Sequence, residues 1–349
     1  MMKKLLVLFV FVGLLMSCNE EESGSADIID LSVTRLSNDA LSVTDIKIDS
    51  YFNKLFIFFD NDLTQHPFPL TITSNIKLSS GAKMSTFADG ELEFSSPDEA
   101  KQIVVEAEDG TQEKWYLYLI HQQIQNADFE HWFTNVGMNG KAYEEIGYSL
   151  VESFWATANM GTSMYSTYGT QPVYEGEETL VQVKTDSTSQ VPVTAGTLFT
   201  GRFDISGAIA NPTDPKKATF FGIPFRHRPE AMQVWLKYQA GDQTIQASLR
   251  DPNNIFGGFT VTELDDPDQC SVYAILEHRD DQEVVEIARA EFSSTTTADE
   301  LTLTTIPFVY SANELPTHLT VVFTSSKEGD LWKGAVGSTL IVDKLKMIY

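Results

Sequence analysis

Short β-rich runs separated by turn residues cover most of this chain, and this pattern constrains the fold more than any other feature. The clearest example is an Asp109-Gly110 pair between two β-rich arms at 103–107 and 114–119. Asp and Gly tolerate the positive φ of a tight turn, so this segment predicts a β-hairpin. From residue 127 onwards the same alternation continues without a long amphipathic helix. The pattern predicts an all-β protein.

The amino terminus carries a predicted export signal. Lys3 and Lys4 precede an apolar run of 12 residues at 5–16, and small residues follow. This run is shorter than the ~20 residues that span a bilayer. A basic start and a small residue before the cleavage point are typical of a secretory peptide. We therefore expect residues 1–17 to be a signal peptide.

Cys18 is the predicted site of lipid attachment. The segment Leu15-Met16-Ser17-Cys18 resembles a bacterial lipobox, in which cleavage before the cysteine leaves it as the lipid-modified first residue. A plain signal peptide with an incidental cysteine is the alternative. The acidic start of the following tether (18–26) resembles the export tag of Bacteroidetes surface lipoproteins, although it also suits a simple solvated tether. The resemblance implies an outer-membrane lipoprotein, exposed at the cell surface and held there by lipid alone.

Two β-sandwiches are expected after the tether. The first, at 27–122, contains β-rich runs at 41–48, 54–59, 70–78, 91–94, 102–107 and 114–119. Its closing hairpin resembles that of the Ig-like modules of Bacteroidetes surface lipoproteins, which usually act as spacers. A polar stretch at 120–126 is the predicted connector. Residues 127–349 are long enough for one large jelly-roll or lectin-like sandwich.

Charge and motif content exclude several classes of function. The chain has 24 Lys and Arg against 49 Asp and Glu, a formal net charge of −25, and such a surface repels a phosphate backbone. We therefore expect no nucleic-acid partner. The sequence contains no P-loop, H-E-x-x-H or G-x-S-x-G motif. Cys270 lies in a strand-like run, which favours a packed small side chain over a nucleophile.

The C-terminal part resembles the PCMD family, the putative carbohydrate metabolism domain of Bacteroidetes lipoproteins. The resemblance covers 127–349 and depends on several segments in order: 129–132 (FEHW), 154–159 (FWATAN), 195–201 (AGTLFTG), 222–225 (GIPF) and 340–349 (LIVDKLKMIY). It implies a jelly-roll or lectin-like sandwich, similar to galactose-binding domains, with a role in glycan recognition or metabolism. It brings no established catalytic residues.

Sugar binding requires flat apolar faces for the C–H side of the ring and a few polar groups for the hydroxyls. Candidate faces are Trp132, Trp155, Tyr165, Tyr168, Trp235 and Tyr238, and candidate donors are Asn159, Arg202, Arg226 and Arg228. Alternation in 232–238 places Trp235 with Gln233 and Lys237 on the more polar side of a strand. For any single aromatic residue, core packing is the alternative, and Arg228 could simply brace the strand that follows Pro229.

Two carboxylates are candidate ligands of a structural calcium ion. In the last strand, alternation places Asp343 on the apolar side with Ile341, Leu345 and Met347. Glu130 belongs to an N-x-x-F-E start that, together with such an ending, resembles the calcium site of carbohydrate-binding jelly rolls. Oxygen ligands suit calcium. Hydrogen bonds to backbone amides, or pairing with Lys or Arg, are the alternatives, and no cofactor is required.

We therefore expect a surface lipoprotein whose jelly-roll domain binds glycans. A glycoside hydrolase acting through an unassigned carboxylate pair is the first alternative, because 49 acidic residues leave many pairs open. A structural or adhesive surface protein is the second. The sequence leaves the sugar, the linkage and the oligomeric state open.

Overall fold

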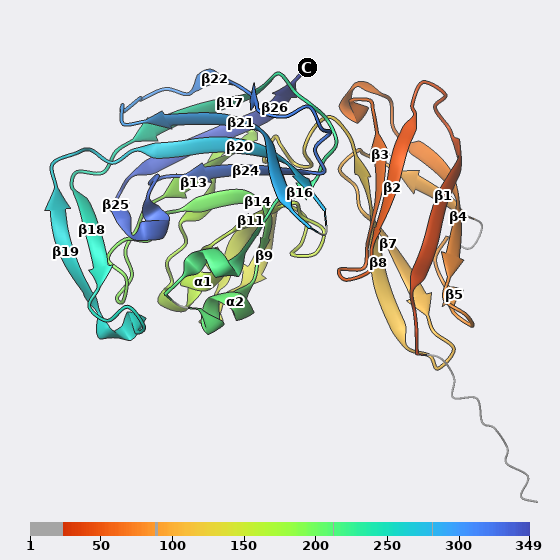
Figure 1. The fold of residues 1–349 in the computed structure, drawn as a ribbon, viewed down its shortest axis with the longest axis horizontal. Helices are drawn as coiled ribbons and strands as arrows, with labels where there is room; N and C mark the ends of the chain where they lie inside the picture. Colours follow the sequence, from red (N-terminus) through yellow and green to blue (C-terminus); the bar gives the residue numbers. More distant parts are fainter. Residues whose placement is uncertain (1–23, 88–89, 212, 281) are drawn as a thin grey trace, which may run out of the picture.

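The structure is a computed structural model that describes residues 24–87, 90–211, 213–280 and 282–349. The predicted signal peptide, Cys18 and most of the tether lie outside the described residues. Within them the chain is almost all β and forms two sandwiches side by side (Figure 1). This confirms the predicted fold class.

The N-terminal sandwich consists of a three-stranded and a five-stranded sheet. The first has the order β1 (Ile28–Leu36), β4 (Leu70–Leu78), β6 (Glu91–Phe94), and the second β2 (Val43–Asp49), β3 (Lys54–Phe59), β8 (Gln112–Ile120), β7 (Lys101–Glu106), β5 (Lys83–Met84). The predicted hairpin is β7–β8, with Gly110 at φ 86° in its turn. Trp115 is buried between the sheets and donates its indole N–H to the carbonyl of Ala26 at 3.1 Å.

The C-terminal sandwich packs an eight-stranded sheet against a five-stranded sheet. The larger sheet has the order β11 (Trp155–Thr157), β14 (Thr197–Phe203), β24 (His318–Thr324), β20 (Cys270–Arg279), β21 (Val284–Ser294), β23 (Val309–Tyr310), with β15 (Thr219–Phe221) on β14 and β16 (Ile223–Pro224) on β24. The smaller has the order β12 (Thr170–Glu175), β13 (Glu178–Lys184), β26 (Thr339–Ile348), β17 (Ala231–Gln239), β22 (Thr302–Pro307). Cys270 is buried between them, and burial raises the pKa of its thiol to about 11.

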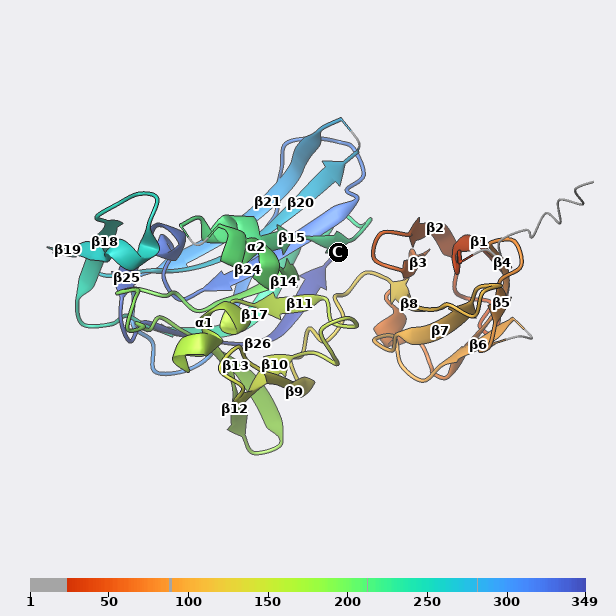
Figure 2. The same ribbon diagram turned by 90° about the horizontal axis from the view of Figure 1, so that it is seen from below.

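Smaller elements decorate this sandwich. They are the pair β9 (Trp132–Val136) and β10 (Ala142–Ile146), the sheet β19 (Phe259–Leu264), β18 (Thr244–Leu249), β25 (Lys333–Ala335), and the helices α1 (Asn159–Thr162) and α2 (Ile205–Ala210). Single 3₁₀ turns lie at Leu63–Gln65, Ser163–Tyr165, Pro215–Ala218, Ile255–Gly257 and Gly329–Leu331. In Figure 2 the β12–β13 and β20–β21 hairpins project from opposite sides of the sandwich. None of the helices in the described residues is long and apolar enough to cross a membrane.

One buried hydrophobic cluster, which we call the shared core, continues from the C-terminal sandwich across the junction to the outer face of the N-terminal five-stranded sheet, and the N-terminal sandwich also has a separate core between its own sheets. Phe58 and Tyr118 of the N-terminal sandwich belong to the same buried cluster as Phe154 and Phe225 of the C-terminal one. The Tyr118 hydroxyl donates to the carbonyl of Val151 at 2.9 Å. The predicted connector at 120–126 is mostly buried at this junction rather than solvated. The N-terminal sandwich is therefore packed against its neighbour, whereas a simple spacer would make few such contacts.

Candidate functional site

The outer face of the five-stranded sheet presents an exposed tryptophan. As the sequence predicts, Met232, Val234, Leu236 and Tyr238 of β17 point into the core, and Gln233, Trp235 and Lys237 point outward. Trp235 is 39% exposed, whereas Trp115 and Trp155 are buried and Trp132 and Trp332 are half-buried. Trp235 is the tryptophan that a ligand in solution can reach most easily.

A bulge in β26 turns Asp343 toward the same outer face. Lys344 adopts φ 48°, and the pairing of β26 with β17 shifts by one residue between Gln233 and Trp235. Leu345 and Met347 therefore share the core face with Leu340 and Val342. The prediction that Asp343 shares a face with Leu345 and Met347 is wrong, because simple alternation does not include the extra residue of a bulge.

Asp343 lies directly opposite Trp235 in this pairing, so the two side chains share a face. On the other side of Trp235, β22 contributes the exposed Leu303. Gln233 lies opposite Lys346, and Lys237 opposite Ile341. We call this surface the Trp235 face, and it consists of Gln233, Trp235, Lys237, Leu303, Ile341, Asp343 and Lys346.

Asp343 is a buried carboxylate within this face. It is 3% exposed, and its Oδ1 has no hydrogen-bond partner among the described residues. Its Oδ2 lies 3.3 Å from the Lys344 ammonium, which also pairs with Glu178. Burial raises the pKa of Asp343, and Lys344 acts against that rise. The Lys344 ammonium and the Asp343 carboxylate therefore form an ion pair at the edge of the Trp235 face.

The first and last segments of the C-terminal sandwich meet beside Asp343. The Leu345 N–H donates to the carbonyl of Ala127 at 2.8 Å, and both oxygens of Glu130 accept the Thr179 N–H at 3.1 and 3.2 Å. The part of the chain that is described contains no group of three His, Cys, Asp or Glu that could hold a metal. The unpartnered Oδ1 of Asp343 nevertheless suits a hard cation. A calcium ion here would be held by Asp343 and Glu130 with backbone or water oxygens, and would supply only structural charge neutralisation.

Most of the other predicted ligand residues have structural contacts. Trp155 donates its indole N–H to the carbonyl of Gln125 at 2.9 Å, and Trp132 to that of Phe129 at 2.8 Å. Asn159 is buried and bonds both the N–H and the carbonyl of Thr170. Tyr238 is buried as well. The buried side chains among these cannot touch a sugar in this conformation.

The three predicted arginine donors lie in different environments. Arg228 donates to the carbonyls of Ala312 and Glu314 at 3.0 and 2.6 Å. Arg226 pairs with Asp45 of the N-terminal sandwich at 2.5 Å. Arg202 is exposed and stacks between two aromatic rings. Of the three, Arg202 alone has guanidinium N–H groups with no hydrogen bond or ion pair in the described residues.

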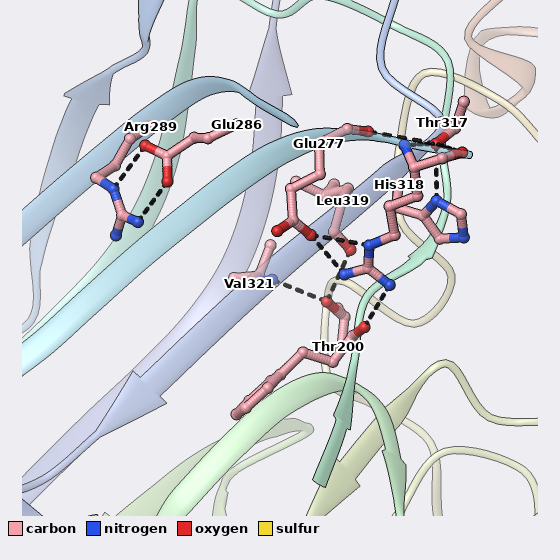
Figure 3. A network of polar contacts seen from close by, with 10 residues as sticks. Thr200, Glu277, Glu286, Arg289, Thr317, His318, Leu319 and Val321 are labelled. Carbon is pink, nitrogen blue, oxygen red and sulfur yellow. Dashed lines mark hydrogen bonds and ion pairs between the residues drawn. The ribbon is translucent and has the colours of Figure 1, made fainter. Parts of the chain in front are cut away.

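The eight-stranded sheet carries a polar network that motif searching does not detect (Figure 3). Arg279 donates to Glu277 from Nε at 3.1 Å and to the carbonyl of Phe221 at 2.9 Å, and Arg289 makes a two-point contact with Glu286. Burial, with the nearby Arg279, lowers the pKa of His318 to about 3, so this imidazole is neutral at pH 7. The charged groups of Arg279 and Glu277, and of Arg289 and Glu286, therefore neutralise each other on the sheet.

A hydrolase would need an acid and a second carboxylate across an open cleft. Burial raises the pKa of Glu145 to about 7, as in a general acid, but this side chain is closed off from solvent. Asp98 and Glu99 line a hollow at the junction of the sandwiches. Asp98 accepts the Asn126 N–H at 2.8 Å and Glu99 the Ser95 N–H at 2.6 Å. Both carboxylates therefore accept hydrogen bonds from backbone N–H groups, which is a structural role.

Comparisons with known proteins agree with the resemblance in the sequence. A model of the putative carbohydrate metabolism domain family matches residues 128–348. The crystal structure of a putative glycoside hydrolase from Bacteroides thetaiotaomicron VPI-5482 is 24% identical with a TM-score of 0.54, over 95% of this chain and 98% of that chain. Another putative glycoside hydrolase, from Bacteroides vulgatus ATCC 8482, is 22% identical with a TM-score of 0.51, over 63% and 96% of the two chains. Identities this low show a shared fold alone, and no curated protein matches the sequence.

Proposed function

Because the chain belongs to the putative carbohydrate metabolism domain family, we propose that it binds glycans and that the Trp235 face is the binding surface. The observation that carries this proposal is the exposed indole of Trp235 on the outer face of the five-stranded sheet. A partly exposed indole keeps apolar surface available for the C–H side of a pyranose.

The surroundings of Trp235 suit a sugar. Leu303 extends the apolar surface on one side, and Gln233, Lys237 and Lys346 supply polar groups around the indole. Amide and ammonium groups can donate hydrogen bonds to sugar hydroxyls. Asp343 is too deeply buried to meet the sugar, and its pairing with Lys344 instead positions that ammonium at the edge of the surface.

The same proposal includes the location of the protein. Lipid attachment at Cys18 would hold the chain at the outer membrane, and the tether would leave both sandwiches in the medium. The N-terminal sandwich, packed through Phe58 and Tyr118 against its neighbour, would then act as a rigid mount for the binding surface.

A glycan array compared between the wild type and Trp235→Ala tests the proposal. We expect the wild type to bind a defined set of neutral oligosaccharides and Trp235→Ala to lose at least about tenfold in affinity for them. Phe256→Ala is the matched control, since Phe256 is a strongly exposed aromatic residue between β18 and β19. Equal binding by the wild type and Trp235→Ala would overturn the assignment of this surface.

A further inference from the structure

A second exposed aromatic cluster lies where the two sandwiches meet. The Arg202 guanidinium of β14 stacks between the ring of Phe52, from the β2–β3 turn, and the ring of Phe220, from β15. The guanidinium carbon is 4.8 Å from the Phe52 centroid and 4.4 Å from the Phe220 centroid. Tyr51 meets Phe52 edge-to-face at 4.6 Å and is 86% exposed, and Phe220 is 50% exposed. We call this group the Arg202 cluster.

The two aromatic rings contact the guanidinium, and its N–H groups have no other partner in the described residues. Among the residues that the structure describes, the Arg202 side chain has no hydrogen bond or ion pair, whereas Arg226 pairs with Asp45 and Arg279 with Glu277. The carboxylate of Asp49 accepts the N–H groups of Tyr51 and Phe52 at 3.1 and 3.2 Å, and so holds the turn in place. Two ring contacts therefore restrict the guanidinium while its N–H donors remain available to a ligand.

A second cation on the N-terminal side reinforces the positive charge. Lys54 at the start of β3 lies over the Tyr118 ring at 5.2 Å and makes no ion pair in the described part of the chain. Burial lowers the pKa of Lys54 to about 8, Asp49 raises it, and Arg202 lowers it further. Lys54 follows Phe52, the ring that contacts Arg202, by two residues, so the second cation lies at the end of the same turn.

We propose that Arg202 and Lys54, with Phe52, Phe220 and Tyr51 around them, form a second sugar-binding site that takes an acidic residue of a glycan, specifically the carboxylate of a uronic acid. The proposal rests on the proposed function, because it presumes that the protein binds glycans, and it adds a second site and a ligand class. A planar guanidinium offers two parallel N–H groups that match a carboxylate. The exposed rings of Tyr51 and Phe220 supply apolar surface for the sugar ring.

This site requires both sandwiches. Arg202 and Phe220 come from the C-terminal sandwich, whereas Phe52, Tyr51 and Lys54 come from the N-terminal one. The shared core fixes the two halves relative to each other. The N-terminal sandwich therefore contributes directly to ligand recognition.

Titration calorimetry on the two-sandwich chain with galacturonate oligosaccharides tests the inference. Their methyl-esterified forms, carrageenan oligosaccharides, which carry sulfates but no carboxylates, and a neutral glycan that binds on the array are the comparison ligands. We expect the free acid to bind, and methyl esterification or Arg202→Gln to weaken it by at least about tenfold. Higher salt should weaken it as well. Arg202→Lys should restore only part of the affinity, because it keeps the charge but not the planar donors.

The controls separate this inference from the proposed function. Arg250→Gln removes an exposed arginine at the β18–β19 turn and should change nothing. Binding of neutral glycans that Trp235→Ala abolishes, without binding of galacturonate, would overturn the inference and leave the proposed function standing. Binding of the carrageenan oligosaccharides alone among the acidic ligands would assign a sulfate and overturn the uronic acid. Binding of no glycan at all would overturn the proposed function together with this inference.

Discussion

Trp235 and Asp343 lie opposite each other on neighbouring strands, on the outer face of the five-stranded sheet. The pairing places an exposed indole beside a buried carboxylate whose Oδ1 has no partner in the described residues. Such a carboxylate is costly unless something neutralises it. Lys344 does so in part, at 3.3 Å from Oδ2.

Calcium is the first prediction. We expect calcium to raise the melting temperature of the wild type, because an ion held by Asp343 and Glu130 binds only the folded state; at ~100 times Kd this contributes about 2.7 kcal/mol. Asp343→Asn and Glu130→Gln should each remove most of the effect. Thermal unfolding in calcium and in a chelator measures it. Identical melting curves in both buffers would contradict a calcium site. Glu130 and Asp343 would then have only their contacts with Thr179 and Lys344.

Glu145 predicts how stability depends on pH. Its pKa is raised from 4.5 to about 7 by burial, so the folded state keeps a proton that the unfolded state has lost. Stability from this group is complete below about pH 4.5 and is lost as pH rises through about 7. Glu145→Gln should therefore stabilise the protein at pH 8 by about 1–3 kcal/mol and have little effect at pH 4. Urea unfolding at the two pH values measures both effects, and an equal change at both would contradict the burial argument.

The shared core predicts joint unfolding. Phe58 of the N-terminal sandwich is buried in the same cluster as Phe154 and Phe225. Phe58→Ala should cost about 3–5 kcal/mol and lower the melting temperature of the whole molecule. Differential scanning calorimetry should show a single transition for the wild type. Two transitions, with only one shifted by Phe58→Ala, would mean that the sandwiches are energetically independent.

Lipid attachment at Cys18 predicts where the protein is found in the cell. With Cys18→Ser, we expect the protein to leave the membrane fraction and to lose labelling by a fatty-acid analogue, because no other lipid anchor is predicted. Cys270→Ala is the control, since the thiol of Cys270 is buried and cannot be modified without opening the core. Immunoblots of fractionated cells measure the distribution. A Cys18→Ser protein that stays in the membrane fraction would contradict lipid anchoring.

Local patterns were sufficient to predict some of these features. Alternation along β17 correctly placed Trp235 on the polar face, and Asp109-Gly110 correctly marked the β7–β8 hairpin. The position of Asp343 was not predictable in the same way, because it depends on a bulge at Lys344 that has no clear signature in the strand.

Contacts between segments far apart in the sequence could not be predicted either. Arg202 and Phe52 lie in different sandwiches, and only the packing of Phe58 and Tyr118 against Phe154 brings them together. Trp155 and Trp235 look alike in sequence, yet one donates its N–H inside the core and the other faces water. Residue type alone could not separate a binding surface from a core.

The most direct test of the account follows the five indole N–H signals of the protein by NMR, with selective ¹⁵N labelling, during titration with a neutral glycan that the array identifies. Trp235→Phe assigns the Trp235 signal. We predict that this signal shifts with saturation while those of the buried Trp115 and Trp155 stay in place. Saturable binding that leaves the Trp235 signal unchanged would contradict the claim that the glycan lies on the Trp235 face.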